Sequence, residues 1–221
     1  MSGLCEQHKI AWDCATGSGQ AAVELIRHFD HVIATDASAA QIEHATLHPH
    51  VEYHVATAEE STLLNASVDL VTVAQALHWF DLDRFFTEVR RVAAPGAAIA
   101  VWSYGDPVMD NPVLNDVLQR FNGGTLASHW PSERRAVGEG YYELPFPFSE
   151  VRTPSLTLEQ KWTLEELTGY VRTWSAVNAY RMAKGVDPVV EFERELGQHW
   201  SRDHDTHVVR WPLAIRAGKI D

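Results

Sequence analysis

The sequence predicts an α/β fold built around a mostly parallel sheet. Between residues 8 and 101, short runs rich in β-branched residues alternate with segments of helical periodicity. A glycine-rich turn follows the first of these runs, and Pro95-Gly96 turns the chain into the last. Alternation of this kind is typical of βαβ units, whose strands lie parallel.

Strands are expected at residues 9–14, 31–35, 51–55, 68–74 and 97–102. The clearest helix lies between the last two strands, because its apolar residues recur at helical spacing. The expected apolar face consists of Leu82, Phe85, Phe86, Val89 and Val92. The residues expected to face water are Asp83, Arg84, Glu88, Arg90 and Arg91.

After Tyr104 the alternation stops, and several helix signals take over. Thr163 and Glu166 have the spacing of a capping box, and Asp187-Pro188 is typical of a helix start. The strand-like residues 206–216 contain Pro212, which favours an edge position or a bulge. We therefore expect one domain over residues 1–221, with a core at 8–104 and cap helices and final strands at 105–221.

Composition restricts the partners and the compartment. Lys and Arg total 18 against 30 Asp and Glu, and the net charge of −12 argues against nucleic acid and anionic membranes as partners. The two cysteines, Cys5 and Cys14, form no disulfide framework, and no apolar run has membrane-spanning length, so a cytoplasmic location is expected. The twelve histidines have no recognised ligand spacing, so no metal site is expected.

A candidate ligand site lies at residues 13–20, Asp-Cys-Ala-Thr-Gly-Ser-Gly-Gln, where the first strand leads into a helix. Gly17 and Gly19 allow a sharp turn and a close backbone approach, and the helix start offers N–H groups to an anion. Asp36 ends the second strand and is placed to accept hydrogen bonds from a ribose. The same spacing also satisfies a dinucleotide-binding pattern, so NAD is an alternative ligand, and a tight turn without any ligand is another.

Further stretches carry a family resemblance. The fourth strand runs into residues 74–80, Ala-Gln-Ala-Leu-His-Trp-Phe, and Arg90-Arg91-Val92, Pro95-Gly96 and Trp211-Pro212-Leu213 extend the match over nearly the whole chain. The chain resembles the class I S-adenosylmethionine-dependent methyltransferases, of the type 11-like group that includes trans-aconitate methyltransferase-like proteins. The resemblance implies a Rossmann-like fold with a mostly parallel seven-stranded sheet, an antiparallel last strand and a helical cap. It would place Pro212 inside the sheet, so we expect a bulge there.

The resemblance also implies a site for S-adenosylmethionine. Gly17 and Gly19 would lie against its methionine part, Asp36 on the ribose, and Ala58 with Glu59 near the adenine. Ala74 and Gln75 would line the methyl side. The full set of implied cofactor-binding residues is Asp13, Ala15, Thr16, Gly17, Gly19, Gln20, Asp36, Ala37, Ala58, Glu59, Ala74 and Gln75.

The sequence departs from the family pattern at two places. Ala15 stands where many members have the first glycine, which constrains the loop by one methyl group. The first strand also starts almost at once, without the helical segment that closes over the cofactor in the family, so an open acceptor pocket is expected.

The expected reaction is methyl transfer to a small-molecule acceptor with a carboxylate or hydroxyl group. His78 is the candidate titrating residue beside the methyl group, and Trp79 is a candidate for stacking on cofactor or acceptor. His78 could equally shape the pocket, and Trp79 could equally belong to the core. Arg172 and Arg181 are candidates for binding an acceptor carboxylate, although a solvated helix face explains them as well. The alternatives are a non-catalytic S-adenosylmethionine-binding protein and an NAD-dependent oxidoreductase.

Overall fold

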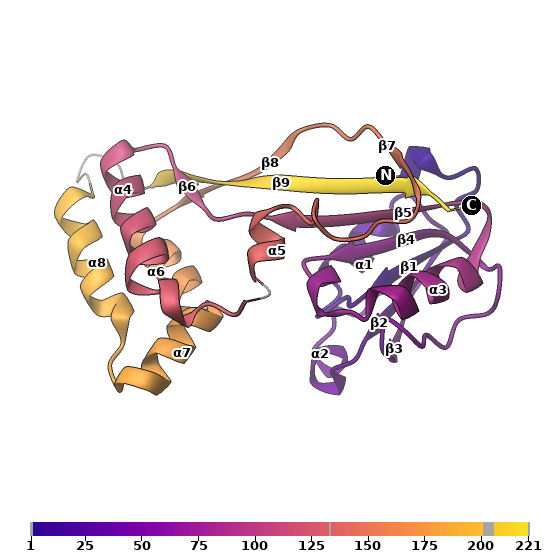
Figure 1. Cartoon of the computed structure of the whole chain (residues 1–221), viewed down its shortest axis with the longest axis horizontal. Helices are drawn as coiled ribbons and strands as arrows, with labels where there is room; N and C mark the ends of the chain where they lie inside the picture. Colours follow the sequence, from indigo (N-terminus) through magenta and orange to yellow (C-terminus); the bar gives the residue numbers. More distant parts are fainter. Residues whose placement is uncertain (1, 133, 201–205, 221) are drawn as a thin grey trace. The chain divides into compact units, whose positions relative to one another are not determined.

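The computed structural model describes residues 2–132, 134–200 and 206–220 (Figure 1). The chain divides into two compact units. The first unit comprises Met1–Tyr104, Ala136–Ser155 and Ala214–Asp221, and the second comprises Gly105–Arg135 and Leu156–Leu213. The first break follows Tyr104, where the alternating sequence pattern ends, while the assignment of the whole chain to one domain stays a prediction.

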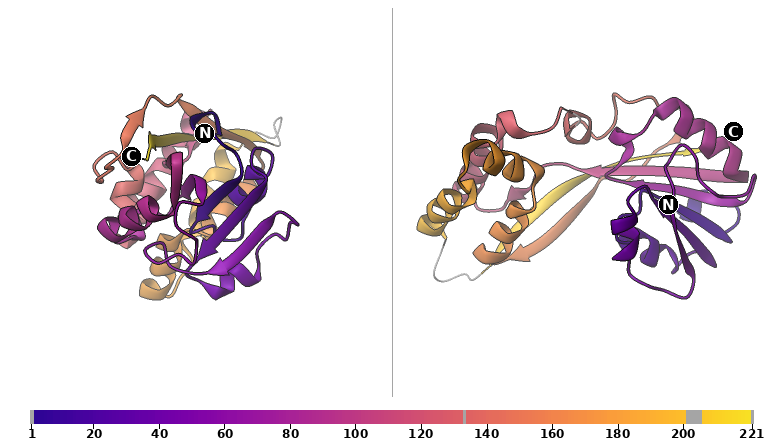
Figure 2. Two further views of the ribbon diagram at one scale, coloured as in Figure 1. Left: turned by 90° about the vertical axis from the view of Figure 1, so that its right-hand side faces the viewer. Right: turned by 90° about the horizontal axis from the view of Figure 1, so that it is seen from below.

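Parallel strands in the order β3-β2-β1-β4-β5 form the centre of the first unit (Figure 2). Their bounds are β1 (Ile10–Cys14), β2 (His31–Asp36), β3 (Val51–Val55), β4 (Val68–Ala74) and β5 (Ala93–Tyr104). β9 (His207–Lys219) follows β5 in the sheet order and pairs antiparallel with β7 (Ser149–Val151). The mostly parallel α/β fold with an antiparallel last strand is therefore confirmed, but the sheet has nine strands within the described residues instead of the expected seven.

The two faces of this sheet belong to different apolar clusters because successive side chains of a strand point to opposite sides. Trp12 and Val71 pack with α3 (Leu82–Val92), whereas Ala11 and Leu70 pack with α1 (Gln20–Leu25). The two helices flank the strands in Figure 1. All residues of β4 from Val68 to Val73 are buried, which is expected for a central parallel strand covered on both faces.

The predicted helix at 82–92 is confirmed, but the expectation that Glu88 faces water is wrong. Glu88 is 7% exposed, and its Oε1 accepts hydrogen bonds from the backbone N–H and the hydroxyl of Ser61, at 2.8 and 2.5 Å. Arg91 Nε donates to Glu88 Oε2 at 2.7 Å. Burial acts to raise the pKa of Glu88, but the hydrogen bonds from Arg91 and Ser61 outweigh it and lower the pKa. The buried carboxylate is tolerated because these groups satisfy it.

The helices of the second unit share one apolar cluster. They are α4 (Pro112–Arg120), α6 (Leu164–Arg172), α7 (Ser175–Lys184) and α8 (Pro188–His199), with a π-helical turn η3 (Phe121–Thr125) after α4. Both predicted helix starts are confirmed: Thr163 and Glu166 form the capping box of α6, and the side chain of Asp187 caps α8.

The bulge expected at Pro212 is absent from the pairing of β9 with β8 (Leu156–Trp162), whose register runs from His207 to Leu213 without a shift. In an antiparallel strand, the N–H and the C=O of one residue point to the same side. The carbonyl of Pro212 accepts a hydrogen bond from Gly105 N at 3.1 Å, so its nitrogen also points away from β8. The missing N–H therefore removes no bond from the β8–β9 ladder.

The remaining elements are short: η1 (Ser2–Leu4), α2 (Ala39–Glu43), η2 (Leu77–Trp79), β6 (Val108–Met109), η4 (Ala127–His129) and α5 (Arg134–Gly138). None of the helices in the described part of the chain combines the length and the apolar character that crossing a membrane requires.

Candidate functional site

Two adjoining cavities lie at the carboxyl ends of the parallel strands of the first unit. The glycine-loop cavity has a volume of about 490 Å³ and the Asp36 cavity about 460 Å³. The glycine-loop cavity is lined by Asp13, Ala15, Thr16, Gly17, Ser18, Gln20, Ala21, Gln41, Ala74, Gln75, Trp102 and Tyr104. The Asp36 cavity is lined by Ala15, Asp36, Ala37, Gln41, Ala56, Thr57, Ala58, Glu59, Ala74, Gln75, Ala76, Trp79 and Phe80. Because four lining residues are shared, one elongated ligand could occupy both.

The loop after β1 turns through left-handed backbone conformations. Ala15, Gly17 and Gly19 have φ values of 55°, 59° and 84°. A Cβ atom on Gly17 would meet nothing within 4 Å, which leaves room for a ligand against the backbone. A Cβ atom on Gly19 would overlap the hydroxyl end of the Tyr53 side chain, which would have to move, and the φ of 84° itself favours glycine there. Ala15 stands where the family often has glycine, and it nevertheless adopts the left-handed conformation, with a φ of 55°.

Asp13 places a buried carboxylate in the lining of the glycine-loop cavity. The residue is 1% exposed, Thr72 Oγ1 donates to its Oδ1 at 2.7 Å, and the hydroxyl of Thr16 donates to its Oδ2. Burial raises the pKa of Asp13 to about 6, although these hydroxyls and the backbone N–H of Ala22 lower it. The groups that donate to this carboxylate are neutral, so a cationic ligand group would stabilise its charge.

Asp36 joins the glycine loop to the end of β2. Its Oδ2 accepts from the backbone N–H of Gly17 at 2.9 Å, and its Oδ1 accepts from Ser38 N at 2.8 Å. A carboxylate offers about four lone-pair sites. Each oxygen can therefore accept a further hydrogen bond from a hydroxyl group in the Asp36 cavity.

The segment that follows β4 forms a wall shared by both cavities. Gln75 has a φ of 56°, and its side-chain nitrogen donates to Tyr104 O at 3.1 Å. Trp79 is 61% exposed and lines the Asp36 cavity, so its ring is available for stacking. Glu59 Oε1 accepts from Asp81 N at 2.9 Å, which connects this cavity to the start of α3.

His78 lines neither of the two cavities, although its ring contacts that of the lining residue Trp79. Its Nδ1 lies 3.0 Å from the hydroxyl oxygen of Tyr141, and the two rings stack with centroids 5.9 Å apart. Burial raises the pKa of Tyr141, whose side chain is fully buried. Contact between His78 and a reacting methyl group therefore stays a prediction.

The structure brings together most of the residues predicted from sequence. All of them line one of the two cavities except Gly19 and His78. Trp102 and Tyr104 also line the glycine-loop cavity but were not predicted. Both lie at the carboxyl end of β5, and the same position in the other strands identified the predicted site residues. Gln41, which lines both cavities from α2, has no comparable signal in the sequence.

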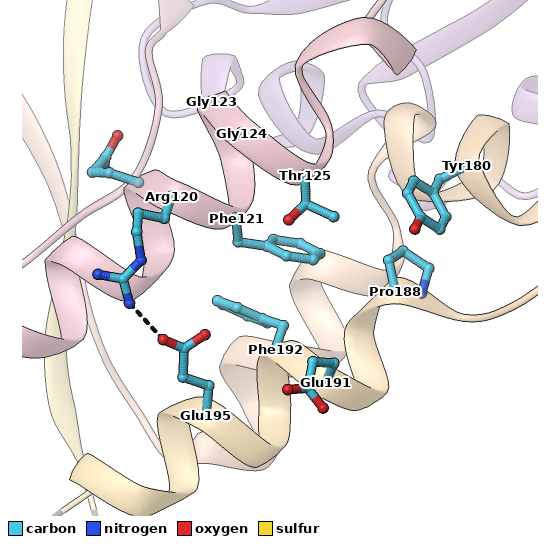
Figure 3. Close-up of a pocket in the computed structure, with 11 residues that line it drawn as sticks. Arg120, Phe121, Gly123, Gly124, Thr125, Tyr180, Pro188, Glu191, Phe192 and Glu195 are labelled. Carbon is cyan, nitrogen blue, oxygen red and sulfur yellow. Dashed lines mark hydrogen bonds and ion pairs between the residues drawn. The ribbon is translucent and has the colours of Figure 1, made fainter. Parts of the chain in front are cut away.

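A third cavity, of about 830 Å³, lies within the second unit (Figure 3). Phe121 and Phe192 stack there with centroids 4.3 Å apart, and Arg120 pairs with Glu195. None of the predicted site residues lines this cavity. The arginines considered for acceptor binding are engaged with carboxylates, since Arg172 pairs with Glu193 and Arg181 with Asp187.

Comparisons with known proteins decide between the ligand classes. A family model described as a methyltransferase domain matches residues 12–101. A protein of Dictyostelium discoideum named as a methyltransferase is 32% identical over 193 residues, which cover 86% of this chain and 73% of that protein.

The chain belongs to the class I S-adenosylmethionine-dependent methyltransferases. A solved structure from Anaeromyxobacter dehalogenans, named as a type II methyltransferase, is similar to this methyltransferase with a TM-score of 0.93 and 45% identity, over 99% of this chain and 93% of the other. A methyltransferase structure from Anabaena variabilis shares the fold, with a TM-score of 0.55 and 18% identity, over 95% of this chain and 93% of the other. The assignment as an enzyme that uses S-adenosylmethionine is confirmed, and the dinucleotide interpretation of the glycine motif is set aside.

The site residues fit the cofactor that the family implies. Asp13 offers a buried carboxylate for an ammonium group, and Asp36 offers acceptors for a ribose diol. The open space over Gly17 admits a ligand close to the backbone.

Proposed function

We propose that this methyltransferase binds S-adenosylmethionine across the glycine-loop and Asp36 cavities and transfers the methyl group to a small-molecule acceptor. One observation carries the proposal: the two cavities adjoin along Ala15, Gln41, Ala74 and Gln75, at the carboxyl ends of the strands. Ligands of open α/β sheets bind at this edge. When bound, S-adenosylmethionine supplies a methyl group on a positively charged sulfur, which a nucleophile displaces in line.

Each cavity would hold a different part of the cofactor. Asp13 and the loop around Gly17 would hold the methionine part, and Asp36 would accept hydrogen bonds from the ribose. Ala58 and Glu59 would lie beside the adenine. The shared wall at Ala74 and Gln75 would then lie near the sulfur, between the two halves of the ligand.

We propose an acceptor with a carboxylate or a hydroxyl group, of which the carboxylate makes the smaller demand on the enzyme. The titratable groups that line the two cavities include the carboxyl groups of Asp13, Asp36 and Glu59. A carboxylate is ionised near neutral pH and needs no general base, whereas a hydroxyl group does. Orientation of the reactants contributes roughly 7–11 kcal/mol, against about 3–5 kcal/mol for a general base, so alignment by the cavity walls would supply most of the catalysis.

Calorimetric titration with S-adenosylhomocysteine, the demethylated product, tests the cofactor site. We expect the product to bind, and Asp36→Asn to weaken binding about 10- to 100-fold, because hydrogen bonds to a charged group contribute about 1.5–3 kcal/mol. Asp30→Asn is the matched control, since it removes the same charge from an exposed position outside both cavities. Equal affinity in Asp36→Asn and the control would contradict the proposed ribose contact.

A screen of acceptors tests the chemistry separately. Product formation from S-adenosylmethionine would be measured with small carboxylic acids and with the matching alcohols and amines. We expect turnover on carboxylic acids, and turnover confined to amines would contradict the proposed oxygen acceptor.

A further inference from the structure

Tyr141 has a strained backbone and a buried hydroxyl group that contacts His78, the residue before Trp79 in the wall of the Asp36 cavity. Its exposure is 0% and its φ is 64°, a left-handed conformation that bulky residues rarely adopt. Strain of this kind persists only where the surrounding structure enforces it, and it gathers at functional sites. The conformation therefore calls for a physical reason.

Arg216 is one of the groups that hold the backbone of Tyr141 in place. Its Nη1 donates to Tyr141 O at 2.6 Å and to Leu144 O at 2.8 Å. The guanidinium carbon lies 4.6 Å from the centre of the Phe146 ring, and the other end of the group pairs with Glu150. Arg216 is itself buried, with 6% of its surface exposed. Its hydrogen bonds to two carbonyl groups hold the backbone around Tyr141 in place.

The hydroxyl group of Tyr141 determines which nitrogen of His78 carries hydrogen. Burial raises the pKa of Tyr141, so the phenol keeps its proton and can donate it. The hydroxyl oxygen also accepts from the backbone N–H of Leu77, and the acceptor within reach of the hydroxyl hydrogen is His78 Nδ1, at 3.0 Å. If Nδ1 carried the hydrogen instead, the buried O–H would lack an acceptor, which is costly. Donation by Tyr141 therefore leaves the hydrogen of neutral His78 on Nε2.

This contact also sets the orientation of the turn η2 at the cavity wall. His78 faces Tyr141, whereas its neighbours Ala76 and Trp79 line the Asp36 cavity. A tilted contact between the His78 and Trp79 rings, with centroids 4.7 Å apart, couples the two side chains. Holding His78 thus holds Trp79 at the cavity.

We propose that Tyr141 is a positioning residue, whose hydroxyl group fixes His78 as the Nε2–H tautomer and holds Trp79 against the cofactor cavity. The inference rests on the proposed function, because the turn matters to catalysis only if the Asp36 cavity binds the cofactor. In this arrangement neutral His78 orients the wall and has no lone pair available as a general base. That role corresponds to the pocket-shaping alternative for His78, and it differs from the other alternative, a titrating residue beside the methyl group.

The tautomer can be measured by nitrogen-15 NMR of the histidine side chains in the full chain. The His78 signals would be assigned by their loss in His78→Gln. We expect an unprotonated Nδ1 and a protonated Nε2 in the wild type, and a changed Nδ1 signal in Tyr141→Phe, which removes only the hydroxyl group. Tyr142→Phe is the control, since Tyr142 is the next residue and is 64% exposed. Hydrogen on Nδ1 in the wild type would overturn the proposal.

Binding of S-adenosylhomocysteine supplies the second measurement. We expect Tyr141→Phe to lower the affinity about 3- to 10-fold, as for loss of one hydrogen bond, while Tyr142→Phe leaves it unchanged. An unchanged affinity together with an unchanged His78 signal in Tyr141→Phe would overturn the positioning role. If the wild type itself fails to bind the product, the proposed cofactor site fails, and the NMR result still decides whether Tyr141 fixes the tautomer.

Discussion

At the scale of single residues, Asp13 couples the cofactor cavity to the stability of the fold. Its pKa is raised from 3.8 to about 6 by burial, so the folded state favours the protonated form. A raised pKa gives a stabilising contribution that is complete below the unfolded pKa and is lost as pH rises through the folded pKa. For a shift from 3.8 to about 6, the loss amounts to about 3 kcal/mol.

We therefore expect Asp13→Asn to remove a specific pH dependence in the unliganded protein. The free energy of unfolding of the wild type minus that of Asp13→Asn should fall by about 2.4 kcal/mol between pH 4 and pH 7, which covers most of the full loss. Urea unfolding at a series of pH values measures both quantities, and the subtraction removes the effect of the other acidic groups. A pH-independent difference would show that burial does not raise the pKa of Asp13.

Ala15 offers a second prediction, because its φ of 55° suits glycine better than alanine. The left-handed conformation costs a residue with Cβ roughly 1–2 kcal/mol, and glycine loses roughly 0.5–1 kcal/mol of chain entropy. The net expectation is that Ala15→Gly raises the free energy of unfolding by about 0.5–1 kcal/mol. Ala40→Gly, in the helix α2, should lower it by a similar amount. A loss of stability in both variants would contradict strain at Ala15.

At the scale of elements, caps and apolar spacing predicted where helices lie more reliably than which side chains contact distant segments. The pattern of α3 located its buried face, yet Glu88 was assigned to water because its partner Ser61 lies 27 residues earlier in the chain. Helical periodicity shows which residues share a face, but it does not show contacts with a segment 27 residues away. Pro212 was misjudged for a related reason, since only the structure tells which side of β9 its nitrogen faces.

The capping box of α6 gives a prediction at this scale. Thr163 Oγ1 accepts from Glu166 N at 3.2 Å, and Glu166 Oε2 accepts from Thr163 N at 2.8 Å. Thr163→Ala removes the side-chain cap and should lower the free energy of unfolding by about 1 kcal/mol. Thr163→Ser keeps the hydroxyl group and should stay close to the wild type in the same urea titration. Equal losses in the two variants would assign the effect to the methyl group instead of the cap.

At the scale of the whole molecule, the first unit was far easier to predict than the second. Its parallel strands have buried β-branched residues and end in polar or glycine-rich turns, so both their positions and the site at their ends follow from sequence. The contacts that shape the site come from distant segments. Tyr53 restricts position 19, and Tyr141 reaches His78 across 63 residues. The sequence pattern gives no distance between such segments.

The two units are expected to differ in how strongly a bound ligand protects them from hydrogen exchange. A ligand stabilises only the state that it binds, by about 2.7 kcal/mol at 100 times its Kd. With S-adenosylhomocysteine at that excess, we expect slower exchange at residues 15–19 and 74–79, which form the glycine loop and the shared wall. Residues 119–125, which line the Phe121–Phe192 cavity of the second unit, should exchange at an unchanged rate.

Mass spectrometry of peptides from the full chain, with and without the product, measures this difference directly. Asp36→Asn provides the control, because a Kd raised 10- to 100-fold should lower the stabilisation from about 2.7 to about 0.4–1.4 kcal/mol and so reduce the protection at residues 15–19 at the same ligand concentration. Protection centred on residues 119–125, and retained in Asp36→Asn, would place the ligand in the larger cavity and contradict the cofactor site at the strand ends. Cavity volume would then predict the binding site better than strand topology, which is the reverse of what the fold and the buried carboxylate of Asp13 lead us to expect.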